Sequence, residues 1–598
     1  MFRSLILLYI LSSSISFAQT SSEILEYSKT NQWNKILYIK NKNQMSESFV
    51  QDKPFFLSAK KNWNSHLELK ATINAFKNKE KHRSGELAEC VFMGRKTLLL
   101  RKWPTLFKPS KCKAFEEWFS GLDAGDLYLV FTSAYPNNPA SMFGHTFFRM
   151  DRKSKGREQG TKELLGYSFS YQARTNPNDS ALAYTYKGIA GGYYSFLEIK
   201  PHYINVGLYN NSESRDIWEY KLKLTEDEKE LFLKHSWEIS ITGAFEYYFF
   251  DENCSTSLLR HLEVIRPNYN YRSKNDLFVV PQVTLREIVQ EYNSPVFQNV
   301  PSIKRKIENS FVQFSSKQKE KFKKGKSDIH ELNQVVDIDV LDTLIDYWKW
   351  KNYQKGGNLD AISKKLMILT LTRRAELVDD SLNKKKINIF YQRPNRGHKL
   401  SKVSVGGGKD HLWLQNRYGF HDFFDSRLGN PESSHIKFFD FKIEKNKEKQ
   451  NFNIDVVDIL SLQNFYFELP QISWRASLSY YDKDDLKFSK LLGGVGVKKI
   501  ILSQDIFALL TISSYKTEKM ATIHPGVNLG YKWILKELKE GSLDFISELY
   551  LDNFIDENIL YGRVDSKLKF NKESESYSLN FSKDFDQDRL SLEYSLYY

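Results

Sequence analysis

The sequence contains only three cysteines, Cys90, Cys112 and Cys254, among 598 residues. A disulfide-dense secreted scaffold is therefore excluded. None of the three belongs to a Cys-x-x-Cys pair, and no His-x-x-x-His pair is present. Because structural and catalytic zinc sites are usually built from ligands at such spacings, we predict no metal site and no cofactor.

Long hydrophobic runs are also missing after the first 18 residues, so no membrane-spanning helix is expected. Residues 1–18 resemble a secretory signal peptide, with Arg3, an apolar run from Leu5 to Leu11, and the small-residue site Ser16-Phe17-Ala18. We expect the mature chain to be exported. No cysteine follows the apolar run, so a lipoprotein anchor is not predicted, and any membrane attachment must use strands or surface contacts.

The glycine-rich stretch at residues 187–193 lacks the Gly-Lys-Ser/Thr ending of a phosphate loop. The net charge of +14 is compatible with nucleic acid, but an exported protein meets anionic lipid, lipopolysaccharide and cell-wall polymers first. Much of the excess charge lies in runs such as residues 304–306, 317–326 and 384–386, which are typical of a solvated basic linker. We therefore predict no nucleic-acid partner.

The number and spacing of the three cysteines suggest one disulfide and one free thiol, Cys254. Cys90 and Cys112 lie close in sequence, and a disulfide between them would close a short loop. That pairing leaves Cys254 as a free thiol in an oxidising compartment, which is the pattern expected of a nucleophile. Two alternatives stay open at this point: Cys254 is a buried inert residue, or a different pair forms the disulfide.

The residues around Cys254 predict the start of a helix. Asp251, Asn253 and Ser255 can each cap a helix, and apolar residues follow at helical spacing, namely Leu258, Leu259, Leu262 and Ile265. Cys254 is therefore expected in or beside the first turn, where the helix dipole favours a thiolate.

The expected partner is His145. Residues 127–131, 144–150 and 164–171 have the composition of β-strands, and a turn-rich loop containing Ser141 and Gly144 leads into the second of them. A histidine at the edge of a strand can reach a neighbouring helix terminus. Taken alone, it is more simply a structural histidine; together with Cys254 it suggests a catalytic pair.

Several separated motifs, in the same order, resemble the Lnb N-terminal periplasmic domain family. They are Asn138-Pro139-Ala140-Ser141-Met142-Phe143-Gly144-His145-Thr146, Lys187-Gly188 with Gly191-Gly192-Tyr193, Arg215-Asp216-Ile217-Trp218-Glu219-Tyr220, Tyr248-Phe249-Phe250-Asp251-Glu252-Asn253-Cys254-Ser255, and Val280-Pro281 with Thr284-Leu285-Arg286. The resemblance covers roughly residues 20 to 290. It implies a permuted papain-like, NlpC-type fold in which the histidine precedes the cysteine, and the family's namesake is a bacterial lipoprotein N-acyltransferase.

Carried over residue by residue, the resemblance makes Cys254 the nucleophile and His145 the base. The family usually orients this histidine with a third polar residue on the next strand, and Ser170 is the candidate here. Asn253, Ser141 and Gly144 are expected to support the pair. A serine orients a histidine less well than Asn, Asp or His, so the third role departs from the usual pattern.

Period-two alternation dominates from about residue 386 to the end, as in residues 543–551 and 590–598. About twelve strands fit, many near the ten residues of outer-membrane strands, and the chain ends on the aromatic Tyr598. A soluble β-sandwich or other closed β domain is the competing interpretation. The exported, aromatic-rich chain favours a barrel in the outer membrane.

We therefore predict an α+β chain in five parts: a signal peptide (1–18), a helical amino-terminal region (19–125), a papain-like thiol-enzyme domain (126–295), a basic helical connector (296–385) and an antiparallel barrel of about twelve strands (386–598). The expected function is a cysteine-dependent acyltransferase, or an acyl hydrolase of phospholipid or lipoprotein, on the periplasmic side of the outer membrane. The alternatives are an NlpC-type cell-wall or protein peptidase, and a non-catalytic barrel with a degenerate periplasmic domain. Oligomeric state is left open.

Overall fold

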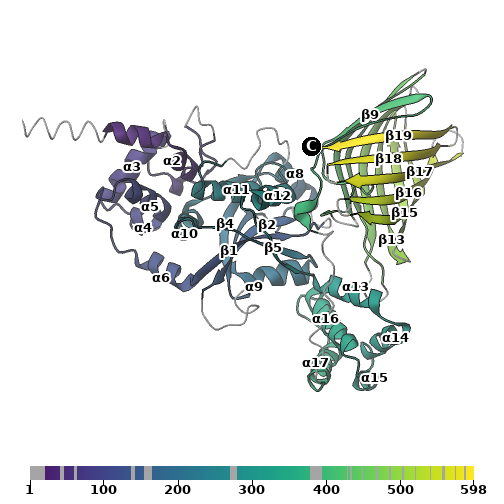
Figure 1. The fold of residues 1–598 in the computed structure, drawn as a ribbon, viewed down its shortest axis with the longest axis horizontal. Coiled ribbons are helices and arrows are strands. Elements are labelled where there is room, and N and C mark those ends of the chain that lie inside the picture. Colours follow the sequence, from purple (N-terminus) through teal and green to yellow (C-terminus); the bar gives the residue numbers. More distant parts are fainter. Residues whose placement is uncertain are drawn as a thin grey trace, which may run out of the picture. The chain divides into compact units, whose positions relative to one another are not determined.

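The computed structural model describes residues 21–40, 46–59, 63–135, 142–153, 164–269, 279–377 and 393–598, the last range with short gaps at 427, 431–433, 448, 467–468, 470, 484–485, 502–503, 519, 539–540, 555–558, 573 and 585–586. The described chain forms two compact units (Figure 1). The first comprises described residues of 1–133, 143–313 and 345–364, and the second those of 134–142, 314–344 and 365–598. The expected signal peptide lies outside the described residues.

Short helices build the amino-terminal part of the first unit: α2 (Asn31–Ile36), η1 (Lys53–Phe55), α3 (Ser65–Lys77), α4 (Ala88–Val91), α5 (Met93–Lys102) and α6 (Lys113–Leu122). They pack around buried Trp33 and Phe76. The buried Arg95 guanidinium binds the carboxylates of Glu68 at 2.8 Å and of Glu238 at 2.9 Å. Because unpaired buried charge is costly, this triad ties the helices to the following domain, to which Glu238 belongs.

A seven-stranded antiparallel sheet forms the centre of the first unit, in the order β6-β4-β3-β2-β1-β5-β7. Its strands are β1 (Ala124–Thr132), β2 (His145–Arg152), β3 (Tyr167–Arg174), β4 (Tyr193–Pro201), β5 (Ile217–Lys221), β6 (Phe245–Tyr247) and β7 (Val296–Val300). The expected strands at 127–131, 144–150 and 164–171 correspond to the inner three. The helical prediction is wrong for residues 296–300, because they pair with β5 at the edge of the sheet.

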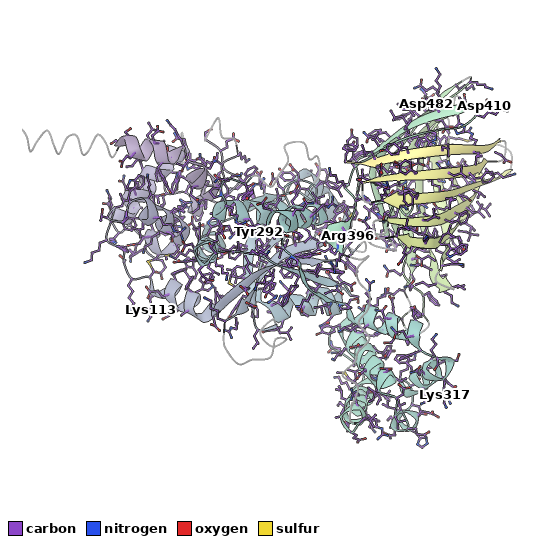
Figure 2. All side chains as sticks on the ribbon, viewed as in Figure 1. Lys113, Tyr292, Lys317, Arg396, Asp410 and Asp482 are labelled. Carbon is purple, nitrogen blue, oxygen red and sulfur yellow. A yellow bond between two sulfur atoms is a disulfide. The ribbon has the colours of Figure 1, made fainter. Side chains whose placement is uncertain are left out.

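Helices cover the sheet, with side chains filling the space between the layers (Figure 2). They are α8 (Ala181–Ala190), α9 (His202–Asn205), η3 (Val206–Ser212), α10 (Glu226–Thr242), α11 (Cys254–Ile265) and α12 (Pro281–Glu291). Helix α10 begins with a capping box, in which Thr225 and Glu228 exchange side-chain and backbone hydrogen bonds. Helix α11 packs against β2 and β3, and every one of its residues is buried.

Five further helices precede the barrel: α13 (Ile303–Gln313), α14 (Ser316–Gly325), α15 (Ile329–Asn333), α16 (Ile338–Gln354) and α17 (Ala361–Ala375). Phe322, Leu332 and Leu344 are buried among the helices of the second unit, so this basic stretch has an apolar core. Within the described chain, no helix is both long and apolar enough to cross a membrane.

The carboxy-terminal strands close into a twelve-stranded antiparallel barrel, which confirms the predicted fold class. They are β8 (Lys402–Gly407), β9 (His411–Arg417), β10 (Ser434–Asn446), β11 (Gln450–Ser461), β12 (Ser473–Lys483), β13 (Leu486–Ile501), β14 (Gln504–Lys516), β15 (Ala521–Leu538), β16 (Gly541–Phe554), β17 (Ile559–Lys572), β18 (Glu575–Asp584) and β19 (Gln587–Tyr597). The last strand pairs with the first, so the barrel is closed. Asp410 and Asp482 mark one rim (Figure 2).

The barrel wall has its polar residues inside and its apolar residues outside. Along β19, Ser591, Glu593 and Ser595 are buried, whereas Leu590 and Leu592 are 60% and 68% exposed. A soluble sandwich or barrel shows the opposite arrangement, with the apolar face buried. A polar lumen and an apolar outer band are the pattern of outer-membrane barrels, so the sandwich interpretation does not fit.

Candidate active site

Cys254 is the first residue of α11, and Asn253 is the N-cap. The Asn253 side-chain oxygen accepts the amides of Ser255 at 2.9 Å and Thr256 at 3.4 Å. Its side-chain nitrogen donates to the carbonyl of Phe249 at 3.1 Å. This cap engages the second and third amides of the helix and leaves the first, that of Cys254, available beside the sulfur.

His145 is the first residue of β2, opposite Thr132 of β1. It follows Gly144, whose φ of +94° is strained for any residue with a side chain, and a Cβ there would lie 2.7 Å from the ring of Phe131. Gly144 thus lets the chain turn tightly into the strand and bring the imidazole to the end of α11.

The structure brings three predicted site residues together. His145 Nδ1 lies 3.2 Å from Cys254 Sγ, and His145 Nε2 lies 3.0 Å from Ser170 Oγ on β3. With Nδ1 facing the sulfur as acceptor, the neutral ring carries its proton on Nε2 and donates it to Ser170. The thiol, the imidazole and the hydroxyl group are thus within hydrogen-bonding reach in sequence along the site.

Successive side chains of β2 point to opposite faces of the sheet, so this strand contributes residues to both sides of the site. Thr146 faces α11, where its Oγ1 lies 3.1 Å from Ser255 Oγ. His145 and Phe147 face the other side, where both rings lie against Tyr209 of η3, at centroid distances of 5.5 and 5.8 Å. The imidazole is therefore held between the helix terminus and an aromatic wall.

Burial controls the protonation of the pair. Cys254 is 6% exposed and His145 9%. Burial raises the pKa of the Cys254 thiol above its usual value, although hydrogen bonds from Thr146 and Ser255 lower it. Burial, together with the nearby charge of Arg215, lowers the pKa of His145 to about 3. The helix dipole alone would favour a thiolate, but desolvation opposes it, so the resting pair is a neutral thiol and a neutral imidazole.

Arg215 is a charged group that affects the pKa values of both His145 and Cys254. Its guanidinium donates to the carbonyls of Ser133 at 2.7 Å and Thr132 at 3.2 Å, binds Glu213 at 2.8 Å, and lies over the Tyr209 ring. It opposes positive charge on His145 and favours negative charge near Cys254. Arg215 thus suits a site in which an oxyanion, rather than an imidazolium, develops first.

The remaining predicted residues are the two paired cysteines and Ser141. Cys90 and Cys112 form a disulfide with their Cα atoms 5.2 Å apart, and Cys254 is free. Ser141 lies outside the described residues. Arg215 lies in the motif at residues 215–220, but no local pattern predicts its role. Tyr209 lies outside the sequence motifs, and η3 offers no sequence signal for it.

Among the described residues, one cluster of three side chains has metal-ligating atoms close together, and it lies in the barrel at His398, His421 and Asp425. The chemistry near Cys254 is that of a thiol, an imidazole and hydroxyl groups. This set can carry nucleophilic attack and proton transfer using protein groups alone.

Three separate segments of the chain match known families. Residues 25–102 match a domain of unknown function, DUF7843, and residues 391–598 match another, DUF7840. Residues 114–291 match the Lnb N-terminal periplasmic domain. No curated protein matches the chain. The chain thus carries an Lnb N-terminal periplasmic domain at residues 114–291, followed by a closed twelve-stranded barrel in its carboxy-terminal region.

Proposed function

We propose that this protein is a cysteine-dependent acyltransferase or acyl hydrolase that takes its acyl group from a phospholipid or lipoprotein at the periplasmic face of the outer membrane. The observation that carries the proposal is the contact of Cys254 Sγ with His145 Nδ1, at 3.2 Å, at the capped start of a buried helix. A periplasmic domain family in the same chain as a barrel with an apolar exterior supports the location.

The reaction begins from the neutral pair. As Sγ attacks the ester or amide carbonyl, its proton passes to His145 Nδ1, and the new carbon–sulfur bond leaves an oxyanion on the substrate. The amide of Cys254 is placed to bind this oxyanion. His145 then returns the proton to the leaving alcohol or amine, and a thioester remains on Cys254. An amine or a water resolves it, with His145 again accepting and returning one proton.

An exposed apolar face beside the site supports a lipid substrate. Tyr209 and Asn205 of the continuous helical stretch 202–212 are buried, whereas Tyr203, Ile204 and Leu208 are 54%, 43% and 43% exposed. One side of this stretch therefore packs on the catalytic histidine and the other offers large apolar side chains to the surroundings. A lipid surface is the partner that stabilises such a face, since burying each of these side chains contributes about 1.5–3 kcal/mol.

The test is mass spectrometry of the full-length protein after incubation with phospholipid vesicles or a diacylated lipopeptide. We expect an acyl adduct on Cys254 that neutral hydroxylamine removes. Cys254→Ser and His145→Gln should abolish it. The matched control is His330→Gln, which alters an exposed histidine of α15 that contacts Gln334.

Two results would contradict the proposal. Unchanged adduct formation in Cys254→Ser would remove the nucleophile from the mechanism. No adduct with lipid, together with release of new amines from peptidoglycan fragments, would identify the protein as a cell-wall peptidase using the same pair.

A further inference from the structure

Residues 420–426 of the barrel domain lie within the lumen, and we name them the plug segment. It follows β9 and precedes β10. Phe420, His421, Phe423 and Asp425 are each at most 3% exposed. A loop at a barrel rim would leave such side chains in water, so their burial needs a specific enclosure.

Asp425 binds one part of the barrel wall. Its carboxylate accepts Arg417 Nη1 of β9 at 2.6 Å, Tyr597 OH of β19 at 2.8 Å, Lys569 Nζ of β17 at 3.3 Å and Lys402 Nζ of β8 at 3.4 Å. Four strands thus converge on one carboxylate. Three cations surround this one buried acid, an arrangement we call the ionic clasp; removing the carboxylate would leave buried charges without their partner, which is strongly unfavourable.

Phe423 binds the opposite part of the wall. Its ring packs on Phe507 of β14 with the centroids 5.6 Å apart, in an apolar cluster with Leu460 and Ile546, and its carbonyl accepts Lys532 Nζ of β15 at 2.8 Å. In a ring of twelve strands, β14 is six strands from β8 and therefore diametrically opposite. Two residues of chain span at most about 7 Å, so the plug segment and its side chains together bridge the lumen.

A second bridge lies between other strands. Arg475 of β12 binds Asp458 of β11 at 2.7 Å, and it also reaches Glu548 of β16 at 2.7 Å and Asn528 of β15 at 3.2 Å. Strands β12 and β16 are four apart in the ring, so this contact also crosses the interior rather than following the wall.

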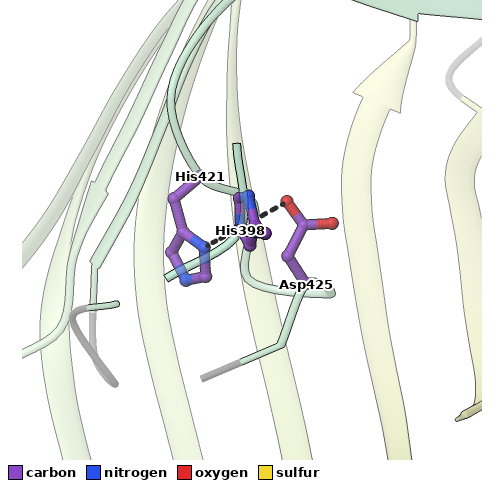
Figure 3. A group of neighbouring side chains, drawn as sticks. All are labelled: His398, His421 and Asp425. Carbon is purple, nitrogen blue, oxygen red and sulfur yellow. Dashed lines mark hydrogen bonds and ion pairs between the residues drawn. The ribbon is translucent and has the colours of Figure 1, made fainter. Parts of the chain in front are cut away.

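The three residues with metal-ligating atoms belong to the same enclosure (Figure 3). His398 Nε2 lies 3.0 Å from His421 Nδ1 and 3.6 Å from Asp425 Oδ2. A divalent cation here would meet Arg417, Lys402 and Lys569 around the same carboxylate, and that repulsion disfavours it. The cluster is better explained as hydrogen bonding that fixes the plug segment.

We infer that the barrel is a sealed membrane anchor and not a channel, closed by the plug segment, which is clasped at Asp425 on one side and packed at Phe423 on the other. Outer-membrane barrels have either a water-filled lumen or a lumen plugged by loops or a helix. In this protein the plug is formed by residues of the same chain. The barrel's role is then to hold the attached periplasmic domain at the membrane without admitting solutes.

The test is single-channel recording of the full-length protein in planar lipid bilayers. We expect no conductance from the wild type and discrete ion steps from Asp425→Ala combined with Phe423→Ala. The matched control is Asp544→Asn, a buried lumen acid whose partners, Ser542 and Asn571, belong to the wall. Its records should stay silent.

Stable conductance from the wild type would overturn the sealed barrel, and a double variant as silent as Asp544→Asn would overturn the role of the plug segment. Heat-dependent mobility on gels checks that each variant has formed a barrel. Should the double variant not form one, Phe423→Cys with Phe507→Cys, in a Cys254→Ser background, provides a second test. Cross-linking of these positions by a short bifunctional methanethiosulfonate supports the plug across the lumen, and the absence of cross-linking in a folded barrel overturns it.

Discussion

The protonation of the catalytic pair gives the sharpest prediction, because two arrangements of one proton lead to opposite pH profiles. For a free cysteine and a free imidazole, moving the proton from sulfur to the ring costs about 3 kcal/mol. Burial lowers the pKa of His145 to about 3, which adds about 5 kcal/mol, and burial of the Cys254 thiol raises its pKa and so increases the cost further. Attraction between the resulting charges over 3.2 Å returns about 5 kcal/mol at an effective dielectric constant of 20. The neutral pair is therefore favoured by about 3 kcal/mol, which leaves the ion pair at about 1% or less.

The assay is the rate of Cys254 alkylation by iodoacetamide in the full-length protein, since this is the free cysteine of the chain. A neutral thiol reacts through its small thiolate fraction, so we expect the rate to rise about tenfold per pH unit between pH 6 and 9. His145→Gln should preserve this slope. A resting ion pair would instead give a rate independent of pH across that range, and His145→Gln would abolish the plateau. A plateau in the wild type refutes the reasoning from burial.

Three other predictions concern residues of the first compact unit. Ser170→Ala removes the acceptor for His145 Nε2–H and should slow thioester formation about fivefold while leaving the fold intact, because a hydrogen bond is worth about 1 kcal/mol. Ser170→Asn should recover most of the rate, and a loss below twofold in the alanine variant would remove Ser170 from the mechanism. Tyr203→Ser with Leu208→Ser should reduce turnover of vesicle phospholipid but not of a short soluble ester, and equal losses on both substrates would argue against a lipid-facing surface. Burial lowers the pKa of His261 to about 3, below its value of about 6.5 in an unfolded chain, so stability is present above pH 6.5 and is lost as the pH falls; going from pH 6.5 to 5 should cost about 2 kcal/mol at this residue, read from urea midpoints, and His261→Gln should flatten that pH dependence.

The sequence was informative where chemistry depends on local signals. Cap residues followed by apolar residues at helical spacing predicted a helix beginning at Cys254, and the Gly-containing loop predicted a strand beginning near His145. Both signals act over a few residues, so a single sequence contains them. The period-two alternation in the last 200 residues likewise predicted about twelve strands, and twelve close the barrel.

What the sequence could not supply is the result of packing between distant segments. The pKa of Cys254 depends on how completely α11, β2 and η3 exclude water, and no local pattern reports that enclosure. Arg215 and Tyr209 reach the pair only because β5, which Arg215 precedes, pairs with β1 next to β2, and because η3 packs against β2. The plug segment is equally non-local: a short run between two strands has the composition of an ordinary loop, and only the closed ring of strands reveals that Asp425 and Phe423 bind opposite walls.

The same non-locality explains why the family boundaries do not mark independent folding units. Residues 25–102 and 114–291 match separate families, yet Arg95 from the first binds Glu238 from the second in a site with no exposure. Tyr38 from the first contacts His235 from the second at 2.7 Å. Glu238, whose pKa burial raises to about 7, needs Arg95 to remain charged. Because α10, which carries Glu238, packs on α11, the amino-terminal helices stabilise the helix that presents Cys254. The folding unit that presents Cys254 is therefore the helical region and residues 114–291 together.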